Sequence, residues 1–214
     1  MILKSKLKHA VYYLCCYLIK IVSFVFFPCK AVGKENIPKS GPFIICPNHI
    51  SMFDAVALNM AYSRPMRYMA KAELFDNRLI GGFLSFFGAF PVNRGTGDKS
   101  AVENAEAMLR NDEPMCIFIE GTRTKNKDSS PGKAKSGAVV IAHSVGCDIV
   151  PTAIVYKHGR PRIFSKTTVY FGTPIKNSEL GDVTGSRESI RSAANAIMSS
   201  ITQMWKAGTE NCQK

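Results

Sequence analysis

Apolar residues fall into short runs that alternate with longer amphipathic stretches along most of the chain. Short apolar runs bounded by turn formers predict β-strands, here at residues 42–46, 66–70, 90–92, 115–119, 147–156 and 168–172. The stretches between them have helical periodicity and predict helices at 52–62, 77–87, 98–110 and 134–146. A last amphipathic helix at 186–207 places Ile190, Ala194, Ile197, Ile201 and Met204 on one face. This alternation predicts an α/β fold, a mixed, largely parallel sheet flanked by helices.

The first 33 residues differ from the remainder in composition. Residues 10–27 are apolar or aromatic almost throughout, and residues 1–34 carry six lysines and no acidic residue. As one helix, residues 10–27 would reach about 27 Å, which is marginal for the hydrocarbon core of a bilayer. Lys20 would lie near the middle of that span, at a cost of about 2.5–3.5 kcal/mol. A helix or helical hairpin lying in one leaflet, with Lys20 reaching the interface, avoids the cost.

We therefore predict a membrane-associating segment at residues 1–33, followed by a single folded domain at residues 34–214. Three alternatives stay open for the segment: a true single span, a secretory signal peptide without a convincing small-residue cleavage site, or a core helix of the domain. Within the domain, the polar stretch at 121–137 is rich in lysine and turn formers and predicts a loop.

Charge and cysteine usage narrow the function classes. The net charge is +12, from 28 Lys and Arg against 16 Asp and Glu, which indicates an anionic partner such as nucleic acid, anionic lipid or a phosphorylated small molecule. Seven cysteines without C-x-x-C spacing disfavour a zinc site or disulfide scaffold and favour a reducing compartment. The sequence also lacks a P-loop and a G-x-G-x-x-G turn, so nothing indicates a nucleotide cofactor.

The turn after the first predicted strand carries the sequence NHISMFD at residues 48–54. His49 and Asp54 are five residues apart, which is about 500° on one continuous helix. If His49 lies in the turn and the helix begins at Met52, the imidazole can fold back toward the Asp54 carboxylate. Such a pair fixes the imidazole tautomer and stabilises the imidazolium that forms when the histidine takes a proton.

Two further features of this turn bear on that interpretation. Ser51 and Asp54 have the S-x-x-D spacing of a capping box, and this spacing by itself requires only a helix start. A helix N-terminus also offers free backbone N–H groups and a partial positive charge, which would keep His49 neutral or hold an anion. No serine or cysteine has nucleophile-elbow spacing, so His49 would act directly on an acceptor hydroxyl.

Four short motifs, in order along the chain, resemble those of the glycerolipid acyltransferase family, which includes the 1-acylglycerol-3-phosphate acyltransferases. They are NHISMFD at 48–54, GAFPVNR at 88–94, FIEGTR at 118–123 and IVPTAI at 149–154. The stretch GKENIPKSGPFIIC at 33–46 resembles the family's lead-in. Four ordered motifs are much more specific than a single His-x4-Asp.

The resemblance implies a role for each matched residue. His49 and Asp54 would be catalytic, and the acceptor would be bound by Lys71, Arg94, Glu120, Gly121, Thr122 and Arg123. Independently of the family, Arg94 and Arg123 each follow a short apolar strand, where side chains converge on a crevice at the sheet edge. Two guanidiniums bind a phosphomonoester through directional hydrogen bonds.

The resemblance also implies the reaction. A fatty-acyl group would pass from acyl-CoA or acyl carrier protein to the free hydroxyl of 1-acyl-sn-glycerol-3-phosphate, making phosphatidic acid, with no metal and no tightly bound cofactor. The partners would be the lysophospholipid, the acyl donor and an anionic membrane surface, at the cytoplasmic face of the cell membrane. The alternative acceptors are glycerol-3-phosphate and another lysophospholipid. A non-catalytic basic binding module is a further alternative, although the sequence lacks nucleic-acid recognition patterns, so we expect no nucleic-acid partner.

Overall fold

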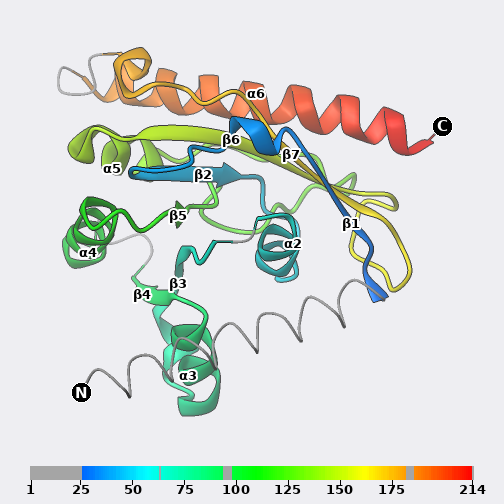
Figure 1. The fold of residues 1–214 in the computed structure, drawn as a ribbon, viewed down its shortest axis with the longest axis horizontal. Helices are drawn as coiled ribbons and strands as arrows, with labels where there is room; N and C mark the ends of the chain where they lie inside the picture. Colours follow the sequence, from blue (N-terminus) through cyan, green and yellow to red (C-terminus); the bar gives the residue numbers. More distant parts are fainter. Residues whose placement is uncertain (1–25, 63, 94–97, 182–185, 214) are drawn as a thin grey trace.

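The fold is a mixed α/β sandwich built on one seven-stranded sheet (Figure 1). The computed structural model describes residues 26–62, 64–93, 98–181 and 186–213. The sheet order is β1-β7-β6-β2-β5-β3-β4. The strands are β1 (Cys29–Val32), β2 (Phe43–Pro47), β3 (Arg67–Lys71), β4 (Ala89–Val92), β5 (Met115–Cys116), β6 (Asp148–Tyr156) and β7 (Thr167–Phe171). The predicted mixed, largely parallel sheet flanked by helices is confirmed.

Strand direction places five carboxyl ends at one edge of the sheet. β6, β2, β5, β3 and β4 are neighbours in that order and all pair in parallel. β7 returns antiparallel to β6, and β1 pairs with β7 in parallel. All five residues of β2 are buried because helices cover both faces of this central strand. The edge formed by the five carboxyl ends is where an α/β sheet places its ligands.

Helices cover the two faces unequally. The longer helices are α2 (Asp54–Ala61), α3 (Arg78–Phe86), α4 (Lys99–Arg110), α5 (Gly137–Val145) and α6 (Arg187–Gln213), with short 3-10 turns at Lys34–Asn36, Ala72–Phe75 and Asn177–Leu180. α2 packs on one face with residues such as Ile45 and Ile154. α4, α5 and α6 contribute to the core on the other face, which includes Ile44 and Ile149. In Figure 1, α6 runs along the side of the sheet opposite α2.

Local sequence explains where several helices begin and end. The Asn77 side chain accepts hydrogen bonds from Leu79 N and Ile80 N and caps α3. The Asp98 carboxylate accepts from Ala101 N and caps α4. α5 ends at Gly146, which has a φ of 76°, a left-handed conformation that glycine adopts without steric cost.

The sequence prediction differs from the structure at several boundaries. β1 was not predicted, and its residues fall within the segment 1–33, so the sheet begins before the predicted domain start at residue 34. The predicted strand at 115–119 is regular only over β5, although Ile117 N and Ile119 N still donate to carbonyls of β2. α6 continues six residues beyond the predicted end at 207, to Gln213. The stretch 121–136 is a loop, as predicted.

The rest of the predicted membrane-associating segment, residues 1–25, lies outside the described residues. Among the residues that the structure does describe, no helix combines the length and the apolar character needed to cross a bilayer.

Candidate active site

The site is assembled where β2 ends and the chain turns into α2. Asn48, the first residue after β2, is fully buried and forms two hydrogen bonds to one residue of β6. Its Nδ2 donates to Ile154 O at 3.1 Å, and its Oδ1 accepts from Ile154 N at 2.7 Å. The side-chain amide therefore continues the β2–β6 ladder after the β2 backbone has left it. This anchors the turn that carries His49.

His49 is held on its backbone and on its ring. Its N–H donates to Glu120 Oε1 at 2.8 Å, and its carbonyl accepts from Thr124 N at 2.7 Å. The imidazole stacks on Phe118, with ring centroids 3.9 Å apart and an interplanar angle of 22°. The side chain is 13% exposed. The ring is thus fixed in position and still open to a substrate.

The imidazole and the Asp54 carboxylate form the predicted pair. Nδ1 of His49 lies 2.7 Å from Oδ2 of Asp54, whose side chain is fully buried. With Nδ1 bonded to the carboxylate, Nε2 is the ring nitrogen that can accept a proton from a substrate.

The Asp54 carboxylate is satisfied by further donors in the same turn and from β6. Oδ2 also accepts from Ile50 N at 2.6 Å and from Ser51 N at 2.9 Å. Oδ1 accepts from the Tyr156 hydroxyl at 2.6 Å. Four hydrogen bonds to one buried carboxylate satisfy both of its oxygens and fix its orientation. The charge that stabilises an imidazolium is therefore positioned before any substrate binds.

Tyr156 was missed by the sequence analysis. It lies at the end of β6, 102 residues from Asp54, and is buried. Burial and the Asp54 charge raise the pKa of its phenol, so it stays protonated and donates to the carboxylate. A tyrosine at the end of an apolar strand was the available signal, but its partner depends on which strand lies beside β2.

The predicted capping box is wrong in detail. α2 begins at Asp54 instead of Met52, and its N-cap residue, Phe53, has no side-chain cap bond. The Asp54 carboxylate binds two amides of the turn, and Phe53 N donates to Ser51 Oγ at 3.2 Å. These amides precede the helix and are occupied, so any anion-binding N–H groups would come from the first turn of α2 itself, which stays a prediction. The occupied amides hold the Asp54 carboxylate in the turn that carries His49.

Comparison with known proteins decides the family. The family model described as "Acyltransferase" matches residues 29–155, more than half of the chain, and this range contains His49, Asp54 and Glu120. The chain belongs to the acyltransferase family.

Relatives of this acyltransferase share most of its length. It is 29% identical over 196 residues to 1-acyl-sn-glycerol-3-phosphate acyltransferase of Bacillus subtilis (strain 168), covering 90% of this chain and 96% of that protein. It is 28% identical to the protein of the same name from Streptococcus pneumoniae, covering 80% of this chain but only 64% of that one. Its fold is similar to the crystal structure of the 1-acyl-sn-glycerophosphate acyltransferase PlsC from Thermotoga maritima, with a TM-score of 0.71, 22% identity, and coverage of 98% and 83% of the two chains.

Both carboxylate oxygens of Glu120 in this acyltransferase accept hydrogen bonds from backbone amides. Oε1 accepts from His49 N at 2.8 Å, and Oε2 accepts from Gly132 N at 3.0 Å. Burial raises the pKa of this carboxyl, and the two amide bonds act in the opposite direction. A Cβ at Gly132 would lie 2.7 Å from Oε2, so glycine is needed for this close approach. Glu120 ties the loop at 121–136 to the turn that carries His49.

The loop brings Arg123 next to the pair. Gly121, with a φ of 69°, turns the chain, and Thr124 N then bonds to the His49 carbonyl. Arg123 directly precedes that bond and is exposed, as is Thr122. Lys135 N donates to Ile119 O at 2.8 Å and closes the far end of the loop. Arg123 is thus placed beside His49 with its side chain open to a ligand.

Of the two remaining predicted acceptor residues, Lys71 lies along the same edge. Lys71 ends β3, is 53% exposed, and pairs with Glu73 at 2.8 Å. Its register partner on β4 is Val92, two residues before Arg94. Arg94 itself lies outside the described residues, and its role stays a prediction. The sheet order places β5, which leads to Arg123, between the strands that lead to His49 and to Lys71.

Proposed function

We propose that this acyltransferase moves a fatty-acyl group from an acyl thioester to the free hydroxyl of 1-acyl-sn-glycerol-3-phosphate, making phosphatidic acid. Two relatives that match most of the chain carry the name of this activity. The observation that carries the mechanism is the 2.7 Å bond between His49 Nδ1 and the buried Asp54 carboxylate, with the imidazole still open on one side.

The first step is proton removal from the acceptor hydroxyl. His49 Nε2 takes the proton as the oxygen attacks the thioester carbonyl, and Asp54 stabilises the imidazolium that results. The tetrahedral intermediate collapses, the carbon–sulfur bond breaks, and the thiolate leaves with the proton returned by His49. The product is a diacyl phosphate and a free thiol. These steps need no metal and no bound cofactor.

The phosphate of the acceptor would bind across the sheet edge beside His49. Arg123 on the loop after β5 and Arg94 after β4 supply guanidiniums, and Lys71 at the end of β3 supplies an ammonium. A phosphomonoester carries close to two negative charges, which two or more cations neutralise. Glu120 and Gly121 would act by shaping the loop, with Thr122 exposed toward the ligand.

Glycerol-3-phosphate and other lysophospholipids stay as alternative acceptors. The first keeps the phosphomonoester and lacks the acyl chain, whereas a lysolipid with a phosphodiester head group keeps the chain and loses one charge. The donor, acyl-CoA or acyl carrier protein, is a second open choice. We place the reaction at the cytoplasmic face of the cell membrane, where both lipid acceptor and donor are available.

Thiol release from a long-chain acyl thioester, with and without 1-acyl-glycerol-3-phosphate, tests the proposal. Acyl-CoA and acyl carrier protein are tried in separate reactions. We expect acceptor-dependent release in the parent, and a loss of about 10²–10⁴-fold in His49→Ala, which should still show a cooperative thermal unfolding transition. His143→Gln, on α5 and distant from the turn, is the matched control and should retain the parent rate.

Two results would contradict the proposal. Release by His49→Ala near the parent rate would remove His49 as the base. Faster turnover of glycerol-3-phosphate than of its 1-acyl form would show that glycerol-3-phosphate is the acceptor, with the same His49 mechanism.

A further inference from the structure

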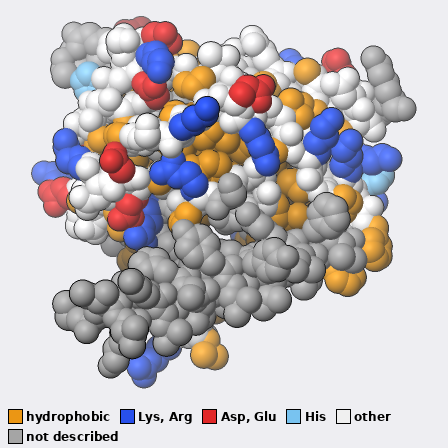
Figure 2. All heavy atoms as spheres, viewed as in Figure 1, with side chains coloured by type: hydrophobic (Ala, Val, Ile, Leu, Met, Phe, Trp, Pro, Cys, Tyr) orange, Lys and Arg blue, Asp and Glu red, His pale blue; other side chains and the backbone are white. Residues whose placement is uncertain are grey.

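The hairpin between β6 and β7 is strongly basic. Residues 157–166 read KHGRPRIFSK, with four Lys and Arg, one His and no acidic residue. Figure 2 shows lysine and arginine side chains with a histidine at the edge of the molecule where this hairpin lies in Figure 1, bordered by hydrophobic side chains. The proposed acyl transfer uses none of these residues.

The tip of the hairpin exposes large apolar side chains. Ile163 is 62% exposed and Phe164 is 70% exposed. Phe164 has a φ of 59°, which is uncommon and costly for a bulky residue. Its conformation is held by Phe164 N donating to Phe26 O at 2.6 Å and by Ser165 N donating to Arg162 O at 3.1 Å. The chain thus accepts backbone strain at a residue whose ring contributes little to the core.

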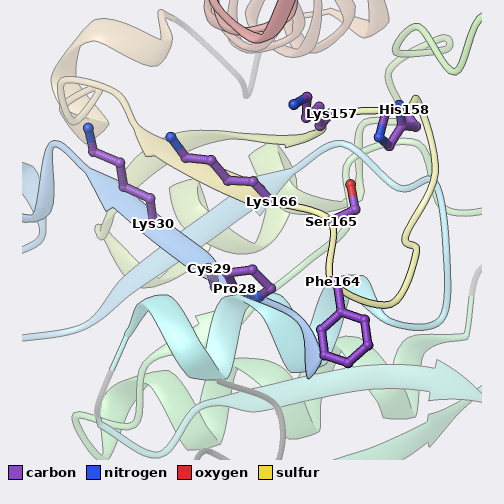
Figure 3. Close-up of a pocket in the computed structure, with 8 residues that line it drawn as sticks. All are labelled: Pro28, Cys29, Lys30, Lys157, His158, Phe164, Ser165 and Lys166. Carbon is purple, nitrogen blue, oxygen red and sulfur yellow. The ribbon is translucent and has the colours of Figure 1, made fainter. Parts of the chain in front are cut away.

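Behind the tip lies a cavity of about 400 Å³. It is lined by Pro28, Cys29, Lys30, Lys157, His158, Phe164, Ser165 and Lys166 (Figure 3). Figure 3 shows the three lysine side chains rising from neighbouring strands toward the same side, with Phe164 pointing to the opposite side. Phe164 and the three lysines line the same cavity, so the apolar tip and the basic side chains adjoin and point to opposite sides of the hairpin.

The register of the strands explains why the lysines face one another. Tyr156 pairs with Thr167, and one step further Lys157 N donates to Lys166 O at 3.1 Å, so the two lysines are directly opposite. Lys30 pairs with Thr168, which lies two residues after Lys166 and on the same face. Like charges opposite each other on antiparallel strands are destabilising. Across the ranges that the structure describes, none of the three ammonium groups pairs with a carboxylate.

The cavity also holds an unsatisfied polar atom. The Ser165 hydroxyl is buried and has no hydrogen-bond partner within the described part of the chain. Figure 3 shows it pointing to the side toward which the lysines rise. A buried hydroxyl normally has a partner. An anion between the lysines would remove the repulsion between them.

We propose that this surface docks on an anionic phospholipid bilayer, with Ile163 and Phe164 inserted among the acyl chains and a lipid phosphate held by Lys30, Lys157 and Lys166. Apolar side chains at the outermost point with cations directly behind them match the layers of a membrane interface. A free phosphate would neutralise the lysines of the cavity, but it would not explain the exposed apolar side chains at the tip.

The position of the hairpin relates this docking to the chain that precedes it and to the active site. The ring centroids of Phe164 and Phe26 are 5.7 Å apart. Phe26 directly follows the basic, apolar sequence of residues 1–25. Tyr156 donates to Asp54 at the catalytic pair, and the next residue, Lys157, lines the cavity. Docking would therefore hold the catalytic edge of the sheet at the lipid surface.

Vesicle sedimentation with the full chain tests the surface without using activity. Vesicles of phosphatidylglycerol and phosphatidylcholine in equal amounts are compared with phosphatidylcholine alone. Each lysine at an anionic surface contributes about fivefold in partitioning, so the double variant Lys157→Gln/Lys166→Gln should need about 25-fold more anionic lipid for half-binding. Phe164→Asn, which tolerates the positive φ, should weaken binding by ~10-fold.

The control removes the same charge elsewhere. Arg187→Gln/Arg191→Gln lies on exposed positions at the start of α6 and should bind as the parent does. In a further experiment, brominated lipid should quench the tryptophan fluorescence of Phe164→Trp more strongly than that of the parent, whose signal comes from Trp205. Unchanged thermal unfolding shows that each variant is folded.

Four outcomes would overturn the proposal. The lysine pair and Phe164→Asn could bind anionic vesicles as the parent does, or the α6 control could weaken binding equally, which would leave only net charge. Release of the parent by inorganic phosphate, beyond the effect of NaCl at the same ionic strength, would assign the cavity to free anions. If the lysine and Phe164 variants still bound vesicles but lost acyl transfer from acyl carrier protein, the surface would instead be a docking site for that protein.

Discussion

Replacing Asp54 by Asn removes the negative charge of the His49–Asp54 pair and preserves most of its hydrogen bonds. Oδ2 of Asp54 accepts from Ile50 N, Ser51 N and His49 Nδ1. An asparagine that presented its NH2 group at this position would face three donors. The carbonyl oxygen should therefore occupy the Oδ2 position, with the NH2 group toward the Tyr156 hydroxyl, which can accept instead of donating.

The expected loss follows from the charge alone, because this orientation keeps the imidazole tautomer. Two unit charges about 4 Å apart attract by about 4 kcal/mol at an effective dielectric constant of 20. Asp54→Asn loses this stabilisation of the imidazolium in the transition state. A loss of ~4 kcal/mol corresponds to a decrease in kcat of about 10³-fold.

Asp54→Ala should behave differently. It leaves the two amides, the imidazole and the Tyr156 hydroxyl without their buried acceptor, at about 1–3 kcal/mol for each unsatisfied group. We expect Asp54→Ala to lower the free energy of unfolding by several kcal/mol, and Asp54→Asn by much less. Thiol release measures kcat, and urea unfolding measures stability. A kcat for Asp54→Asn within threefold of the parent, or equal destabilisation by both variants, would refute the reasoning.

Three further predictions concern the residues around the pair. Tyr156→Phe removes the donor to Oδ1 and should cost about 1–3 kcal/mol in urea unfolding and lower kcat; stability equal to that of the parent would show that the bond contributes nothing. Gly132→Ala places a Cβ 2.7 Å from Glu120 Oε2 and should raise the KM for the acceptor in thiol-release kinetics, whereas Gly137→Ala, with no atom within 4 Å, should have no effect. Burial raises the pKa of Glu120 above its ordinary 4.5, so the folded chain binds this proton more tightly than the unfolded chain does. The stability contributed by the protonated form is therefore lost as pH rises from 4.5 through the raised pKa, and urea unfolding against pH should show this loss in the parent and not in Glu120→Gln.

Local sequence determined the His49–Asp54 hydrogen bond and most of the secondary structure. His49 and Asp54 are close in the chain, and their bond needs only a turn followed by a helix, so spacing and residue type were sufficient to predict it. The apolar runs predicted six of the seven strands because burial on both faces requires continuous apolar sequence. β1 was not predicted because its residues, CKAV, are alternately half-buried and exposed at the sheet edge and follow a longer apolar run.

Tertiary structure alone decided which distant residues meet. β5 lies between β2 and β3, although it follows β4 in the chain, and this order brings Glu120 and Arg123 beside His49. The other neighbour of β2 is β6, which brings Tyr156 to Asp54 across 102 residues. Strand order depends on the burial of both sheet faces by all the helices together, and no local pattern contains it. For the same reason, the opposed lysines of the β6–β7 hairpin became visible only when the register was known.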